Sequence, residues 1–81
     1  MDRVGEWLNE RAVIESTEWS SSERLYNDYE SWARKHGETP IAYTSFSARL
    51  IDRGFIQKRR REAGFPKRGF LGWRLRGLGE A

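Results

Sequence analysis

The chain of 81 residues has no cysteine, a single histidine and no long apolar run. Without cysteine, neither a disulfide framework nor a thiolate metal site can stabilise the fold. No segment approaches the roughly 20 apolar residues that a membrane-spanning helix needs, and no secretory signal pattern opens the sequence. Internal repeats and low-complexity tracts are also absent. We therefore expect a cytoplasmic protein that does not bind a membrane.

Aromatic residues, in contrast, are plentiful: four Trp, three Tyr and four Phe. A chain this short forms one small domain, which must bury most of its large side chains to be stable. Aromatic rings bury much area per residue and can supply such a core. We expect residues 1–76 to form this single domain and residues 77–81 to be a flexible tail.

The spacing of apolar residues predicts two helices in the first half of the chain. Val4, Trp7 and Leu8 recur at three- and four-residue spacing and mark a short first helix. Ser20 and Glu23 have the spacing of a capping box, so the second helix is expected to begin there. This second helix is predicted to end near the Lys-His-Gly sequence at residues 35–37.

A third helix is predicted before Gly54, which suits the left-handed position after a helix end. We expect this helix to extend to Arg53 and to turn Phe46, Leu50 and Ile51 toward the core. Beyond it the period changes to the two-residue alternation of strands, over residues 55–60 and 70–76. The loop between these strands is rich in Gly, Pro, Lys and Arg.

This order predicts the α+β class and, within it, a winged helix-turn-helix: three helices followed by a C-terminal β-hairpin, the wing. A short third strand near Trp19 can pair with the wing. On the return strand, Leu71 is expected on the same side as Trp73, with Phe70 on the opposite side. The expected core consists of Trp7, Leu8, Leu25, Tyr29, Trp32, Phe46, Leu50, Phe55, Trp73 and Leu75.

Charge is divided unequally between the two parts of the chain. Residues 1–38 carry five Lys or Arg against nine Asp or Glu, a net −4, whereas residues 39–81 carry ten against three, a net +7. A molecule with one basic end is oriented by a polyanion, because Lys and Arg displace counterions from phosphates. The expected partner is double-stranded DNA.

The candidate DNA contacts lie on the third helix and on the wing, the two elements that approach DNA in winged-helix folds. On the helix they are Tyr43, Thr44, Ser45, Ser47, Arg49 and Arg53. On the wing they are Lys58, Arg59, Arg60, Arg61, Lys67, Arg68 and Arg74.

Each part of this assignment has an alternative. The basic run at residues 58–61 is also what a solvated sheet edge or a nuclear-localisation signal contains. Tyr43 and Arg49 could instead pack over neighbouring helices. Phe65 and Pro66, at the wing tip, could wedge into a minor groove or fold back onto the sheet.

Several of these features together resemble the C-terminal domain of phage and plasmid primase-helicases, replication proteins with a superfamily-three helicase core. The resemblance rests on Tyr29-x-x-Trp32, the Gly37-x-x-Pro40 turn, Phe46-x-x-x-Leu50, Arg53-Gly54-Phe55 and the return strand Phe70-x-Gly72-Trp73-x-Leu75. It implies a module of a larger primase-helicase polypeptide that binds double-stranded DNA at a replication origin. Family members usually have Ser or Thr at the start of the third helix, where this chain has Ala42.

The sequence gives no indication of catalysis. His36 has no nucleophile or ligand set near it, and the acidic pairs of the first two helices fit a solvated face. We expect a non-enzyme with no cofactor, no metal and no small-molecule substrate. Two other functions remain open: a winged-helix protein-interaction module of a replication complex and a small transcription regulator.

Overall fold

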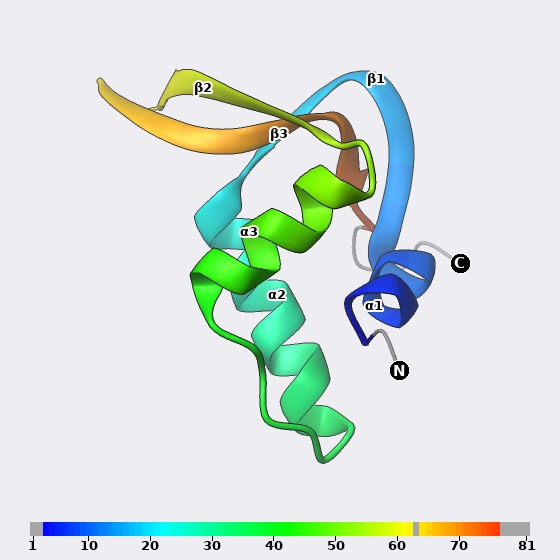
Figure 1. Ribbon diagram of the computed structural model, residues 1–81. Helices are drawn as coiled ribbons and strands as arrows, with labels where there is room; N and C mark the ends of the chain where they lie inside the picture. Colours follow the sequence, from blue (N-terminus) through cyan, green and yellow to red (C-terminus); the bar gives the residue numbers. More distant parts are fainter. Residues whose placement is uncertain (1–2, 63, 77–81) are drawn as a thin grey trace.

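The computed structural model describes residues 3–62 and 64–76. Its elements are α1 (Arg3–Arg11), β1 (Ala12–Ser21), α2 (Ser22–Lys35), α3 (Tyr43–Asp52), β2 (Ile56–Glu62) and β3 (Phe65–Leu75). The strands form an antiparallel sheet in the order β1-β3-β2, and the helices lie on one side of it (Figure 1). The predicted α+β class is therefore confirmed. The tail expected at residues 77–81 lies outside the described residues.

Trp7 is the centre of an aromatic core that joins four elements. Its ring makes edge contacts with Tyr29 of α2, Phe46 of α3 and Trp73 of β3, at centroid distances of 5.8, 5.5 and 6.0 Å. Its indole Nε1 donates a hydrogen bond of 2.8 Å to Asp28, so the polar edge of the ring is also satisfied. Of the ten predicted core residues, eight are buried, while Phe55 and Leu75 are partly buried against them.

Two predictions of side-chain orientation were wrong. Phe70 is fully buried, because the strand alternation is interrupted at Gly72, whose φ of 97° is in the left-handed region. Phe70 and Trp73 consequently reach the same core although they are three residues apart. Ile51 is 48% exposed rather than buried, since Phe46 and Leu50 already occupy the core-facing side of α3 and Ile51 lies a further 100° around the helix.

The expected short strand near Trp19 is instead a strand of ten residues, β1. It pairs with β3 at both ends, and its register shifts between Ile14 and Trp19. The second helix also begins one residue later than predicted, because Ser20 is still paired with Phe70 in the sheet. Ser21 is the N-cap, and its hydroxyl accepts a hydrogen bond of 3.3 Å from the backbone N–H of Arg24.

Candidate nucleic-acid interface

Strands β2 and β3 form a long hairpin that projects past the core. Their pairing continues from Ile56 opposite Leu71 to Glu62 opposite Phe65, so most of the expected loop is strand. Pairing between β1 and β3 ends at Gly69. Beyond Gly69 the hairpin is therefore two-stranded, and it extends away from the helices (Figure 1). Pro66 is tolerated there because no strand on the β1 side needs its missing N–H.

The two sides of the hairpin carry different basic residues. Phe70 points into the core and is paired with Gln57, so this side of the sheet faces the helices. We call it the inner side; alternation along β2 places Arg59 and Arg61 on it as well. The opposite, outer side carries Ile56, Lys58 and Arg60.

On the inner side, Arg59 of β2 is directly opposite Arg68 of β3. Both side chains are exposed, and neither belongs to an ion pair among the side chains that the structure describes. Like charges at directly opposed positions of a sheet repel one another. The register thus places two cationic side chains next to each other at a cost in stability, and an anion bound between them would relieve the repulsion.

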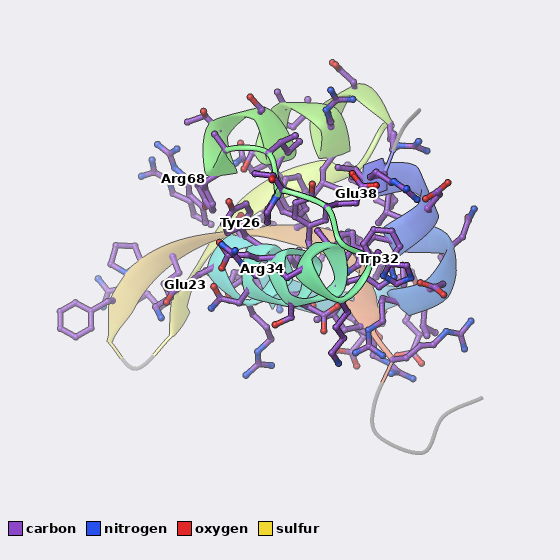
Figure 2. The ribbon with its side chains drawn as sticks, turned by 90° about the horizontal axis from the view of Figure 1, so that it is seen from below. Glu23, Tyr26, Trp32, Arg34, Glu38 and Arg68 are labelled. Atoms are coloured by element: carbon purple, nitrogen blue, oxygen red, sulfur yellow. The ribbon has the colours of Figure 1, made fainter. Side chains whose placement is uncertain are left out.

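Arg68 also faces the first turn of α3. A surface groove is lined by Ser21, Glu23, Tyr43, Lys67 and Arg68, which brings the hairpin together with the starts of α2 and α3. Figure 2 shows Arg68 extending from the hairpin toward the N-terminal end of α3. The inner side of the hairpin and the start of α3 consequently form two walls of one concave basic surface.

The start of α3 adds positive character of its own. Ala42 is the N-cap, with φ −62° and ψ 153°, and it makes no side-chain hydrogen bond to the helix. The first turn of α3 contains no acidic residue. Backbone N–H groups at an uncapped helix start favour anions, as does the helix dipole. Phosphate oxygens are suitable acceptors for these groups.

The predicted residues of α3 differ in accessibility. Thr44, Ser45 and Arg49 are exposed, and Arg53 is exposed at the far end of the helix as its C-cap. Tyr43 is 38% exposed and makes an edge contact with Tyr26 at 5.5 Å. The hydroxyl oxygen of Ser47, in contrast, is buried without a hydrogen-bond partner among the described residues. We therefore remove Ser47 from the candidate contacts.

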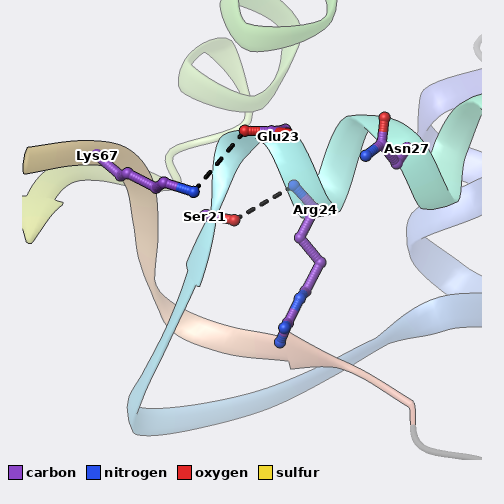
Figure 3. A pocket seen from close by; sticks show the side chains of 5 residues that line it. All are labelled: Ser21, Glu23, Arg24, Asn27 and Lys67. Atoms are coloured by element: carbon purple, nitrogen blue, oxygen red, sulfur yellow. Dashed lines mark hydrogen bonds and ion pairs between the residues drawn. The ribbon is translucent and has the colours of Figure 1, made fainter. Parts of the chain in front are cut away.

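Three predicted wing residues have neighbours other than the opposed pair Arg59 and Arg68, although Lys67 also lines the groove. Arg74 lies opposite Val13 of β1, and its Nε is 3.6 Å from the Glu15 carboxylate. Lys67 turns toward the start of α2, where its Nζ is 4.0 Å from the Glu23 carboxylate (Figure 3). Arg60 is on the outer side, with its guanidinium carbon 5.9 Å from the centre of the Trp19 ring.

Trp19 fixes the position of the hairpin relative to the core. From β1 its ring crosses β3 over Gly69, and its Nε1 donates a hydrogen bond of 2.9 Å to the carbonyl of Lys58 in β2. A Cβ at position 69 would be 2.4 Å from the ring, so only glycine leaves room for this crossing. Sequence analysis did not predict this contact. An aromatic residue that packs over a glycine of a neighbouring strand is a known pairing, but the two residues alone are only a weak signal for it in a sequence.

Three of the four arginines in residues 1–38 are engaged differently, in ion pairs with carboxylates. Arg3 binds Glu6 and Glu38 at 2.6 and 2.5 Å, Arg11 binds Asp28 at 3.1 Å, and Arg34 lies 3.5 Å from Glu30. The hydrogen bond that Arg3 donates to Glu6, followed by the one that it donates to Glu38, raises the pKa of the Arg3 guanidinium. These cations serve to neutralise neighbouring carboxylates, whereas those of the inner side have no such partner in the described part of the chain.

The described residues contain no group of three or more His, Cys, Asp or Glu that could hold a metal ion. Nor does any helix among them have the length and apolar character needed to cross a membrane. No protein-family model matches the chain, and no curated protein matches it either. A functional assignment therefore depends on the arrangement of the residues described above.

Proposed function

We propose that this chain is a winged-helix module that binds double-stranded DNA. In this proposal α3 lies in the major groove and the β2–β3 hairpin is the wing, which contacts the backbone beside that groove. The element order and the sheet order β1-β3-β2 support this assignment. The exposed surface of α3 supports it too, because the small side chains Thr44, Ser45 and Ala48 allow the helix to approach base edges closely.

The observation that carries the proposal is the opposed pair Arg59 and Arg68, next to the uncapped start of α3. Guanidinium groups bind phosphate with two parallel hydrogen bonds, and a duplex presents a line of phosphates along each groove. The inner side can therefore bind one strand of the backbone while α3 reads the groove. Contacts of this kind supply affinity, whereas residues such as Arg49 on α3 supply discrimination between sequences.

The resemblance to primase-helicase C-terminal domains suggests the biological setting of this proposal. There the module would be a non-enzymatic part of a larger cytoplasmic replication polypeptide, would need no cofactor, and would bring the helicase to origin DNA. A net charge of +7 in residues 39–81 supports docking on DNA in one orientation, with the acidic half directed away from the phosphates.

Titration of the protein into a fluorescently labelled random-sequence duplex at several salt concentrations tests this function. If the surface neutralises about four to six phosphates, the logarithm of the binding constant should fall with the logarithm of salt with a slope of about −4 to −5. The separated single strand of the same length serves as the control and should bind more weakly, because it lacks the major groove. Absence of duplex binding at low salt would refute the proposal.

A further inference from the structure

The outer side of the sheet carries an apolar row that the proposed DNA contacts do not use. Ile56 of β2 is opposite Leu71 of β3, and Leu71 is opposite Trp19 of β1. Ile56 is 64% exposed, while the other two side chains are half-buried. In the part of the chain that the structure describes, no helix covers this side (Figure 1). The solvated face of such a sheet is normally polar, so this row indicates a contact surface.

Basic residues border the apolar row along β2. Lys58 and Arg60 share the outer side with Ile56, and among the described side chains neither is in an ion pair. The Trp19 ring is also held in place before anything binds, because it packs over Gly69 and donates a hydrogen bond to the Lys58 carbonyl. A preformed surface loses little conformational entropy on binding.

We propose that the outer side, defined by Trp19, Ile56, Lys58, Arg60 and Leu71, docks an acidic amphipathic segment of a partner protein. Aliphatic side chains of that segment would pack on Ile56 and Leu71, while its carboxylates would pair with Lys58 and Arg60. This chemistry favours a protein segment over a nucleic acid. The Trp19 ring packs over Gly69, and the guanidinium carbon of Arg60 lies 5.9 Å from the ring centre, so the ring is not an open platform on which a base could stack.

This surface is separate from the inner side, and the inference does not depend on DNA binding. Alternation along β2 directs Lys58 and Arg60 away from the side that bears Arg59. A partner on the outer side and a duplex on the inner side can therefore be bound at the same time.

The probe for a test is a synthetic helical peptide of Leu and Glu, added to the ¹⁵N-labelled protein and followed by NMR. The expected shifts are confined to Trp19, including its indole N–H, and to residues around Ile56 and Leu71. A matched peptide with Gln in place of Glu should bind at least about fivefold more weakly, since two charge pairs are lost. Equal binding of the two peptides, or shifts centred on the helices, would overturn the proposal.

Variants separate this surface from its neighbours. Ile56→Gln should weaken the Leu/Glu peptide about five- to tenfold, a loss typical of an anchor residue. Ile51→Gln, which changes an exposed isoleucine of α3, should leave peptide binding unaltered. The peptide should also bind the protein that is already saturated with duplex. Displacement of the peptide by duplex would assign the outer side to DNA and would overturn the proposal.

Discussion

At the scale of single residues, Trp19 and Gly69 decide where the hairpin lies. The indole crosses β3 and reaches the Lys58 carbonyl in β2, so one side chain joins all three strands. The hairpin could otherwise bend about the point where pairing with β1 ends. Its orientation next to α3 therefore depends on a glycine that accepts a ring above it.

Gly69→Ala should lower the free energy of unfolding by about 1–3 kcal/mol, the usual cost of forcing an extra carbon into a packed site. The added Cβ would be 2.4 Å from both the Trp19 ring and the Ser20 carbonyl oxygen, and neither can yield without moving the sheet. Urea denaturation followed by tryptophan fluorescence measures the change. A loss below about 0.5 kcal/mol, the range of ordinary surface substitutions, would contradict the described crossing.

Glu23, like Trp19, was not assigned to the candidate interface by the sequence analysis. The capping-box interpretation gave it a purely local function, but its carboxylate lies in the groove with Lys67 and Arg68. The ion pair with Lys67 is long, at 4.0 Å, and exposed, so it contributes little stability. In the groove, however, the carboxylate opposes the approach of a phosphate.

Glu23→Gln should therefore strengthen duplex binding about two- to fivefold at low salt, and the gain should shrink as salt screens the charges. Fluorescence anisotropy with a labelled duplex provides the measurement. Glu30→Gln removes the same charge from the middle of α2, where the carboxylate pairs with Arg34, and should have a smaller effect. Equal gains from both variants would show that net charge alone, rather than the position of Glu23, affects binding.

At the scale of elements, the start of α3 is less well capped than the start of α2. Ala42 has the extended backbone of an N-cap but no oxygen to accept a hydrogen bond, whereas α2 has Ser21 in that position. Ala42 was identified from the sequence as a departure from the Ser or Thr that primase-helicase domains usually have there. The structure now places it beside the candidate phosphate contacts.

Ala42→Ser should raise the free energy of unfolding by about 1 kcal/mol, because the hydroxyl would accept a hydrogen bond from the first turn. Ala42→Asp should stabilise the helix similarly, yet it should weaken duplex binding, since its charge would repel phosphate at the helix start. Thermal melting and duplex titration of the two variants separate these effects. If Ala42→Asp bound DNA as well as Ala42→Ser does, the start of α3 would not be near a phosphate.

The elements also show how far sequence reasoning extends. The helices were predictable because their apolar residues recur at regular spacing, as in Phe46 and Leu50 or Leu25 and Tyr29, and the hairpin was predictable because the period changes to two beyond Gly54. The burial of Phe70 was not, because it depends on the backbone at Gly72 breaking the alternation. Sequence analysis gave Ser20 as the N-terminal capping residue of α2, whereas Ser21 is the N-cap because Ser20 is paired in the sheet, a tertiary contact.

At the scale of the whole molecule, the sequence shows that residues 39–81 are basic. It does not show that the basic residues of the hairpin are divided between its two sides. The run Lys58-Arg59-Arg60-Arg61 reads as one basic segment, and all of its residues were assigned to DNA together. The register of β2 against β3, anchored by the buried Phe70, divides them into an inner and an outer set. This division gives the DNA-binding proposal its strictest test.

That test compares two variants with the same loss of charge. Arg59→Gln with Arg68→Gln removes the opposed pair of the inner side, while Lys58→Gln with Arg60→Gln removes two cations from the outer side. For the inner variant, the salt slope of duplex binding should become shallower by about 2, as expected for two lost phosphate contacts, and affinity should fall at least about tenfold. The outer variant should keep nearly the full slope. Equal changes in the two variants, with both proteins folded by thermal melting, would contradict binding through the inner side.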